Sequence, residues 1–214
     1  SGGSSMIANA AALGDVSVTG VSAEYNWCRA GGLLGSSAYL THNCYASGNV
    51  SLQDSAESVK NVYLGCLIGE QSGGVVVSGH YFNGAVLRCN GETQTAKATG
   101  SIPSSWYFDY NKITAHDSVT DAAFAAAMND GISESGIAET DAYLTSSGKF
   151  TSYTAESLAA MRPAAWQSWG LADGKVVLGG SQDDPTFAGG DGSETAPFLI
   201  RTEAQLRAFA ATTA

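Results

Sequence analysis

Apolar and small residues alternate with mostly small or polar partners through the first part of the chain. Every second position from Met6 to Ala12 is Met or Ala, and Val16 and Val18 continue the spacing. A period of two bounded by glycine predicts short β-strands, because successive side chains of a strand point to opposite faces. Residues 1–90 lack the helix-period leucines and alanines of helical repeats, so strands are the better interpretation.

The strand pattern repeats. Asn9–Val18 lines up with Asn43–Leu52 at a shift of 34 residues (43 minus 9), and Gly31–Gly35 lines up with Gly65–Gly69 at the same shift. A third, degenerate copy, Ser78–Leu87, follows at about 36 residues without a counterpart of the glycine motif. Two motifs in one register predict a strand solenoid, in which neighbouring coils pair through backbone hydrogen bonds. We expect the array to end with the third copy.

Inward side chains of successive copies are expected to stack in columns. One column joins Ala10, Cys44 and His80. The next inward column joins Ala12, Ala46 and Phe82. Corners of the chain, where φ is positive, are expected at the glycines of the motifs. These corner candidates are Gly14, Gly35, Gly48, Gly69 and Gly84.

The motifs resemble a known family. Asn43–Val50 and Gly65–Gly69, with Gly31–Gly35 before them, are similar to the GLUG-type repeats of large bacterial surface proteins, among them adhesins and the non-catalytic regions of IgA-protease-like proteins. The resemblance covers residues 4–87 and implies a right-handed parallel β-helix. Gly189–Phe209 resembles the segment that opens such a repeat block, yet here it follows the coils. We therefore expect either a fragment of a longer protein or a subunit whose ends are completed by neighbours.

The predicted fold class is accordingly all-β dominated: a right-handed parallel β-helix (solenoid) of about three coils with a mixed α/β, aromatic-rich cap. Three parts are expected. Residues 1–101 form the β-helix repeats, residues 102–180 form the capping region with short helices and a hairpin, and residues 181–214 form a Gly/Asp linker and the opening segment of a following block. A cap is expected because a strand stack has open edges that natural proteins cover.

The capping region carries its own local signals. Arg88–Gly100 is polar and predicts an excursion from the last coil, and an aromatic cluster follows at 106–110. Asp117 or Ser118 is expected to cap a helix that ends at Gly131. The face of this helix is expected to carry Val119, Ala123 and Ala127, with Phe124 and Met128 beside them.

Three further elements are predicted downstream. Thr154 begins a capping-box pattern for a helix with Leu158 and Met161 that is broken at Pro163. Trp169–Leu178 predicts a hairpin with an Asp-Gly turn. Thr202–Gln205 is a second capping-box pattern. The four Trp and nine Tyr are interpreted mainly as cap residues, and the alternative is that some line a carbohydrate-binding face.

Charge excludes one class of partner. Ten Lys and Arg against twenty Asp and Glu give a net charge of −10, so the basic footprint of a nucleic-acid-binding protein is missing. Charged residues make up 14 % of the chain, below the roughly 25 % of typical domains. No run approaches the 18 or so apolar residues of a membrane span, so no membrane insertion is expected in this segment.

Candidate chemistry is sparse. Cys28, Cys44, Cys66 and Cys89 have no metal-ligand spacing, and we favour buried thiols over disulfides. His42, His80 and His116 are the only histidines, and none belongs to a His-Glu-x-x-His motif. No Gly-x-Ser-x-Gly elbow supports a Ser-His-Asp assembly.

The acidic residues, and an asparagine predicted to stack on one of them, are interpreted as parts of turns, loops and linkers. Asp15 and Asn49 are expected to stack as a solvated turn, and Asp54 and Glu57 to lie in a loop. Asp183-Asp184 and Asp191–Glu194 are interpreted as an acidic linker rather than a calcium site, because the motif occurs once and lacks the later acidic ligands. No catalytic, cofactor-binding or metal-binding residue is assigned, no cofactor is expected, and the binding residues are unknown.

The functional hypothesis is a non-catalytic structural or adhesive module of a bacterial cell-surface or secreted protein. Its expected partners are a protein or glycan on a host or neighbouring cell, and other copies of itself through open solenoid ends, with residues 187–214 adding head-to-tail to a neighbour. The expected location is extracellular or at the cell surface. The alternative is an accessory domain of a surface hydrolase, either IgA-peptidase-like or a glycan-active β-helix enzyme.

Overall fold

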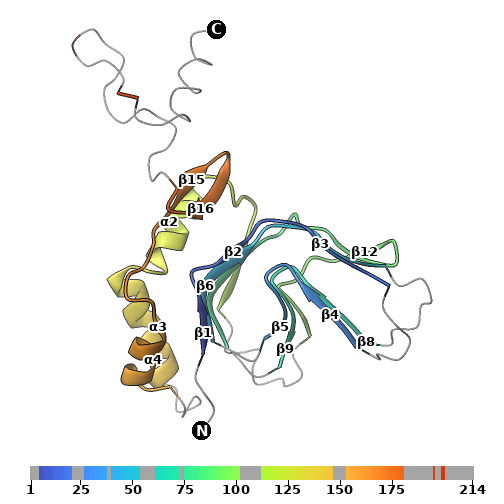
Figure 1. The fold of residues 1–214 in the computed structure, drawn as a ribbon, viewed down its shortest axis with the longest axis horizontal. Helices are drawn as coiled ribbons and strands as arrows, with labels where there is room; N and C mark the ends of the chain where they lie inside the picture. The colour runs from blue at the N-terminus through green and yellow to red at the C-terminus, as the bar shows by residue number, and fades with distance from the viewer. Residues whose placement is uncertain are drawn as a thin grey trace. The chain divides into compact units, whose positions relative to one another are not determined.

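The computed structural model describes residues 5–20, 27–37, 40–53, 61–72, 75–101, 112–146, 153–180, 195 and 199–200 (Figure 1). The chain divides into two compact units, one of residues 1–118 and 131–166 and one of residues 119–130 and 167–214. The predicted aromatic cluster at 106–110, the acidic pairs at 183–184 and 191–194, the loop residues Asp54 and Glu57, and the capping box at 202–205 lie outside the described residues.

Among the described residues, the first unit contains most of the strands and two helices. Its helices are α3 (Glu134–Ser146) and α4 (Ala155–Met161). Its strands are β1 (Met6–Ala8), β2 (Ala11–Ala12), β3 (Val16–Thr19), β4 (Trp27–Gly31), β5 (Leu34–Ser37), β6 (Leu40–Ala46), β7 (Val50–Gln53), β8 (Asn61–Gly65), β9 (Ile68–Gln71), β10 (Val76–Phe82), β11 (Leu87–Cys89), β12 (Glu92–Gln94), β13 (Thr99–Ser101) and β14 (Ile113–His116).

The strands of the first unit form four sheets in which most pairs are parallel. The strand orders are β1-β6-β10-β14 with β2 also on β6, β12-β11-β7-β3, β13-β9-β5, and β4-β8. The 34-residue shift of the sequence is the register of four of these pairings: Met6 pairs with Leu40, Val16 with Val50, Trp27 with Asn61, and Leu34 with Ile68. Equivalent residues of the first two copies therefore lie side by side.

The predicted fold class is wrong. The described part of the chain has mixed sheets, several of them parallel, together with three helices, and the sheets are not coiled into a solenoid. One reason is local: Asn90 and Gly91 both have positive φ, so the chain reverses after β11 and β12 pairs with it antiparallel. A second is the amount of helix in the C-terminal half, where α3 alone spans thirteen residues and was not predicted.

The third copy is also shifted from its predicted register. Gly79, not His80, pairs with Cys44, and Tyr81, not Phe82, pairs with Ala46. The shift is 35 residues in β10, and a slip of one residue turns every side chain to the other face of the sheet. The array does not end there, because β13 pairs with β9 and β14 pairs with β10.

None of the five predicted corner glycines has positive φ. Close backbone approach, rather than φ, requires glycine at the second-copy positions. A Cβ on Gly48 would lie 2.0 Å from the carbonyl oxygen of Gly14, and a Cβ on Gly69 would lie 2.5 Å from that of Gly35. Positive φ occurs instead at Asn9, Asn43 and Ser78, each with φ of 53°.

Two apolar clusters lie among the sheets, and a third joins helices to them. The largest cluster contains buried Val50, Leu52, Leu64, Cys66 and Leu87. Helices α3 and α4 lie alongside β1 and β6 (Figure 1) and contribute Leu144 and Leu158 to a cluster with Leu40, Val75 and Val77. The expectation for α4 is confirmed: Thr154 is its N-cap and forms a capping box with Ser157.

The second unit contains α2 (Ala122–Asp130) and the antiparallel pair β15 (Trp169–Ala172) and β16 (Lys175–Leu178). The hairpin prediction is confirmed, with positive φ at Asp173 and Gly174 in the turn. The predicted cap of α2 is wrong, because Asp121 Oδ1 accepts the hydrogen bond from the Phe124 N–H. Its buried residues are Phe124, Ala125 and Met128, whereas Ala123 of the predicted face is exposed.

Candidate functional site

A ladder of polar side chains crosses β1, β6 and β10. Asn43 Nδ2 donates to Asn9 Oδ1 over 2.9 Å, and Ser78 Oγ donates to Asn43 Oδ1 over 3.3 Å. All three residues are in the left-handed region, where a residue with a Cβ costs roughly 1–2 kcal/mol unless a short polar side chain compensates locally. Asn9 and Asn43 occupy equivalent repeat positions, and this was the signal in the sequence that could have predicted the ladder.

Two histidines continue the ladder from Ser78. His80 Nε2 lies 3.1 Å from Ser78 Oγ, and His80 Nδ1 lies 2.9 Å from His116 Nε2. The single hydroxyl proton of Ser78 goes to Asn43, so Ser78 accepts from His80 Nε2–H. His80 Nδ1 is then an acceptor and receives the proton of His116 Nε2–H. Each donor in this row of five side chains, from His116 to Asn9, therefore points toward the first copy.

This direction decides what the Ser78–His80–His116 arrangement can do chemically. An activated serine needs a neighbouring base that accepts its proton, with a third group that stabilises the resulting imidazolium. Here Ser78 donates to Asn43, and the third group is another imidazole. Burial, and then the nearby His116, lower the pKa of His80 to about 4. The neutral His80 holds Ser78 in place as part of a structural ladder.

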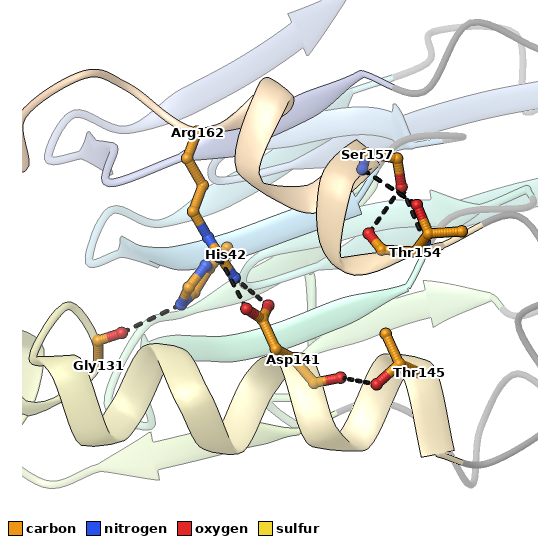
Figure 2. A network of polar contacts seen from close by, with 7 residues as sticks. All are labelled: His42, Gly131, Asp141, Thr145, Thr154, Ser157 and Arg162. Carbon is orange, nitrogen blue, oxygen red and sulfur yellow. Dashed lines mark hydrogen bonds and ion pairs between the residues drawn. The ribbon is translucent and has the colours of Figure 1, made fainter.

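A second group of polar contacts includes His42 and residues of α3 and α4 (Figure 2). Its Nε2 lies 3.1 Å from the Gly131 carbonyl oxygen, which can only accept, so Nε2 carries the proton. Burial is the main cause that lowers the pKa of His42, and Arg162 lowers it further, while the hydrogen bond to Gly131 and the charge of Asp141 oppose them. The buried Nδ1 has no hydrogen-bond partner in the part of the chain that the structure describes.

Arg162 and Asp141 complete this network. Arg162 Nη1 donates to Asp141 Oδ2 over 2.9 Å, and Nη2 pairs with Oδ1, so the ion pair is bidentate. The pair joins the C-cap of α4 to the middle of α3, and the ring of Trp166 lies 5.3 Å from that of His42 in an edge-on arrangement. The ion pair thereby fastens the end of α4 to α3.

Asp15 and Asn49, predicted as a solvated turn, are both exposed, and their side chains also bind backbone N–H groups. Asp15 Oδ1 accepts from the Asn49 N–H over 2.8 Å, and Asn49 Oδ1 accepts from the Val86 N–H over 2.8 Å. Both of these hydrogen bonds are exposed to solvent. Each copy thus uses one side-chain oxygen to bind the backbone of the next copy.

None of the four cysteines forms a disulfide. Cys28, Cys44 and Cys66 are buried and Cys89 is half-buried. Burial raises the pKa of Cys44 to about 12 and raises the pKa of Cys66. A thiol held protonated in this way is a poor nucleophile and metal ligand. In the described ranges no three His, Cys, Asp or Glu side chains come together as metal ligands would.

One aromatic side chain of the sheets is exposed, outside the region where aromatic residues were expected to gather. Trp27 on β4 is 48 % exposed. The Arg29 guanidinium carbon lies 5.2 Å from the centroid of the Trp27 ring, and the Tyr63 ring lies 5.6 Å from it. Arg29 also forms an ion pair with the buried Glu70. We call Trp27, Arg29 and Tyr63 the β4–β8 aromatic surface.

Comparison with protein-family models, with curated proteins and with solved structures found no match to this chain. The resemblance to GLUG-type repeats therefore rests on the residues quoted for it. Among the described residues, no helix is long and apolar enough to cross a membrane.

Proposed function

We propose that this chain is a non-catalytic structural or adhesive module of a bacterial cell-surface or secreted protein, and that it associates head-to-tail through its C-terminal segment. The observation that carries the proposal is the outer edge of the first copy. In the described part of the chain, β1, β3, β4 and β5 each pair on one side only, with β6, β7, β8 and β9. Unpaired strand edges present rows of N–H and C=O groups that can pair with another chain.

Side-chain contacts between neighbouring copies support a load-carrying role. The ladder from Asn9 to His116 and the turn contacts of Asp15 and Asn49 both cross from copy to copy. Such contacts add directional hydrogen bonds to the apolar packing, which fixes the register of the strands. A rigid surface in fixed register is what a stalk or a scaffold for adhesion requires.

The β4–β8 aromatic surface supports the adhesive half of the proposal. Trp, Tyr and Arg are the residues enriched at binding hot spots, and an exposed indole ring offers a face for stacking. The ion pair with Glu70 neutralises Arg29, so the surface carries little charge although the chain carries −10. An uncharged ligand, such as a neutral glycan or an apolar protein segment, fits this surface best.

Deleting residues 187–214 tests the head-to-tail association. The full chain is expected to form polymers whose mass rises with concentration in multi-angle light scattering, and the deletion is expected to leave monomers. Circular dichroism of the deletion variant checks that the sheets persist. Equal polymerisation with and without the segment would contradict the proposal.

A further inference from the structure

Two pairs of equivalent glycines differ in what surrounds them. A Cβ on Gly48 would lie 2.0 Å from the carbonyl oxygen of Gly14, whereas a Cβ on Gly14 would have no atom within 4 Å. A Cβ on Gly69 would lie 2.5 Å from the carbonyl oxygen of Gly35, whereas a Cβ on Gly35 would meet only Arg29 of its own copy, at 3.0 Å. The second-copy glycines are thus needed because the backbone of the first copy lies against them.

The first-copy glycines have no such need within the chain. Gly14 is exposed and does not have positive φ, so an L-residue is sterically acceptable there. The Gly14 carbonyl oxygen fills the place where a Cβ on Gly48 would lie. The equivalent place in the first copy is where a Cβ on Gly14 would lie. A further strand stacked on the first copy in the same register would bring its own backbone to this place.

Burial of paired side chains shows the same asymmetry. Val16 and Val50 are paired with each other, and Val50 is fully buried while Val16 is half-buried. Met6 is half-buried although its partner Leu40 is fully buried. The second copy is covered on both sides, by β1 and β3 on one side and by β10 and β11 on the other. The first copy has apolar side chains at the same positions as the second. In the described part of the chain, however, β1 and β3 are covered by neighbouring strands on one side only.

We infer that the outer edge of β1 and β3 around Gly14 is a receiving surface for strands of a second copy of this chain, added in parallel and in the register that joins the first copy to the second. This inference rests on the proposed function and names the acceptor side of the head-to-tail contact. The contact joins two different surfaces and does not close, so it builds filaments rather than dimers.

The internal contacts also specify the polar partner of the incoming strand. Asp15 Oδ1 accepts from the Asn49 N–H, and Asn49 Oδ1 accepts from the Val86 N–H. By the same rule, the incoming strand presents an Asp or Asn oxygen to the Asp15 N–H. Each whole chain carries a net charge of −10, so added salt, which screens the repulsion between chains, promotes the association.

The substitution Gly14→Ala tests the receiving surface. The added Cβ meets open space in the single chain, so the unfolding midpoint is expected to stay unchanged or to rise slightly. In the filament it would overlap the incoming backbone as it would at Gly48, so the concentration needed for polymerisation is expected to rise about tenfold or more. Light scattering of the full chain at several salt concentrations measures this, with Thr93→Ala on β12, at the opposite edge of the β3 sheet, as the matched control.

The outcomes separate this inference from the proposed function. If Gly14→Ala polymerises like the unchanged chain while deletion of 187–214 abolishes polymers, the receiving surface lies elsewhere and the inference is overturned. If Gly14→Ala blocks polymerisation while the deletion does not, the surface is supported and the C-terminal donor is refuted. Unchanged chain that stays monomeric at every concentration and salt overturns both.

Discussion

The first and second copies of the repeat have nearly the same motif but different surroundings. Val16 pairs with Val50, and Gly14 occupies the same position of the motif as Gly48. The two second-copy residues are buried, whereas Val16 is half-buried and Gly14 is exposed. The same side chain therefore contributes differently to stability according to whether a neighbouring copy covers it. Matched substitutions at equivalent positions measure what that neighbour supplies.

The largest difference is expected at the glycine pair. Gly48→Ala forces a Cβ against the backbone of Gly14, at 2.0 Å, and is expected to lower the free energy of unfolding by about 3 kcal/mol or more. Gly14→Ala is expected to be neutral or to stabilise by up to about 1 kcal/mol, because it restricts the unfolded chain. Urea unfolding of both variants measures the difference. Equal effects would contradict the role given to the neighbouring copy.

A pH-dependent loss of stability is expected from the third copy. His80 titrates near its ordinary pKa of 6.5 in the unfolded chain, but burial lowers its pKa to about 4 in the folded chain. Between these values the unfolded state binds more protons, so stability is fully present above about pH 6.5 and is lost as pH falls toward 4. At about 1.4 kcal/mol per pKa unit the loss from this group is roughly 3–4 kcal/mol.

The variant His80→Gln checks the source of that loss. Urea unfolding between pH 7 and 4 should show a smaller slope for the variant than for the unchanged chain. The buried His42, whose pKa is also lowered, and Glu139, whose pKa is lowered by Lys112, are expected to contribute to the slope that remains. An undiminished slope in His80→Gln would show that His80 is not the group responsible.

Breaking the ladder in its middle is expected to cost roughly 2–3 kcal/mol. Asn43→Ala removes the partner of both Asn9 and Ser78 and leaves a Cβ at a φ of 53° without a local polar group to compensate. Asn43→Gly removes the same hydrogen bonds but tolerates the φ, so it should cost about 1 kcal/mol less. Thermal unfolding of the two variants separates backbone strain from lost hydrogen bonds. If the Gly variant is no more stable than the Ala variant, strain is not stored at this position.

The valine pair gives a smaller contrast. Val50→Ala removes fully buried methyl groups and is expected to cost about 2 kcal/mol, whereas Val16→Ala is expected to cost about 1 kcal/mol or less. Both are measured by urea unfolding under conditions where the chain is monomeric. Under polymerising conditions the Val16→Ala cost should rise toward that of Val50→Ala, because a second copy would cover Val16.

The smallest effect on stability is expected at the β4–β8 aromatic surface. Trp27→Ala should change the unfolding midpoint little, since the indole is 48 % exposed. If the surface binds a neutral glycan such as chitohexaose, the variant should weaken binding about tenfold in isothermal titration calorimetry. Retained binding would place the adhesive site elsewhere.

Local features were predictable from neighbouring residues. The 34-residue register, the Thr154–Ser157 capping box and the Asp173-Gly174 hairpin follow from motifs whose partners lie nearby or repeat at a constant spacing. Features that depend on distant packing were not. The ladder needed the positive φ of Asn9 and Asn43, and α3 has a polar, weakly patterned sequence that becomes helical where Leu144 packs with Leu40.

What the residues alone determined about this protein is therefore the periodicity: short strands, their 34-residue spacing, and the turn and capping signals. Periodicity depends on each residue and its near neighbours, and these are written in the chain. The tertiary structure decided the register of the third copy, the Ser78–Asn43 and Asn43–Asn9 hydrogen bonds and the contact of His42 with Gly131. Each of these depends on contacts between residues at least 30 positions apart or on a one-residue slip, and the hydrophobic pattern distinguishes neither.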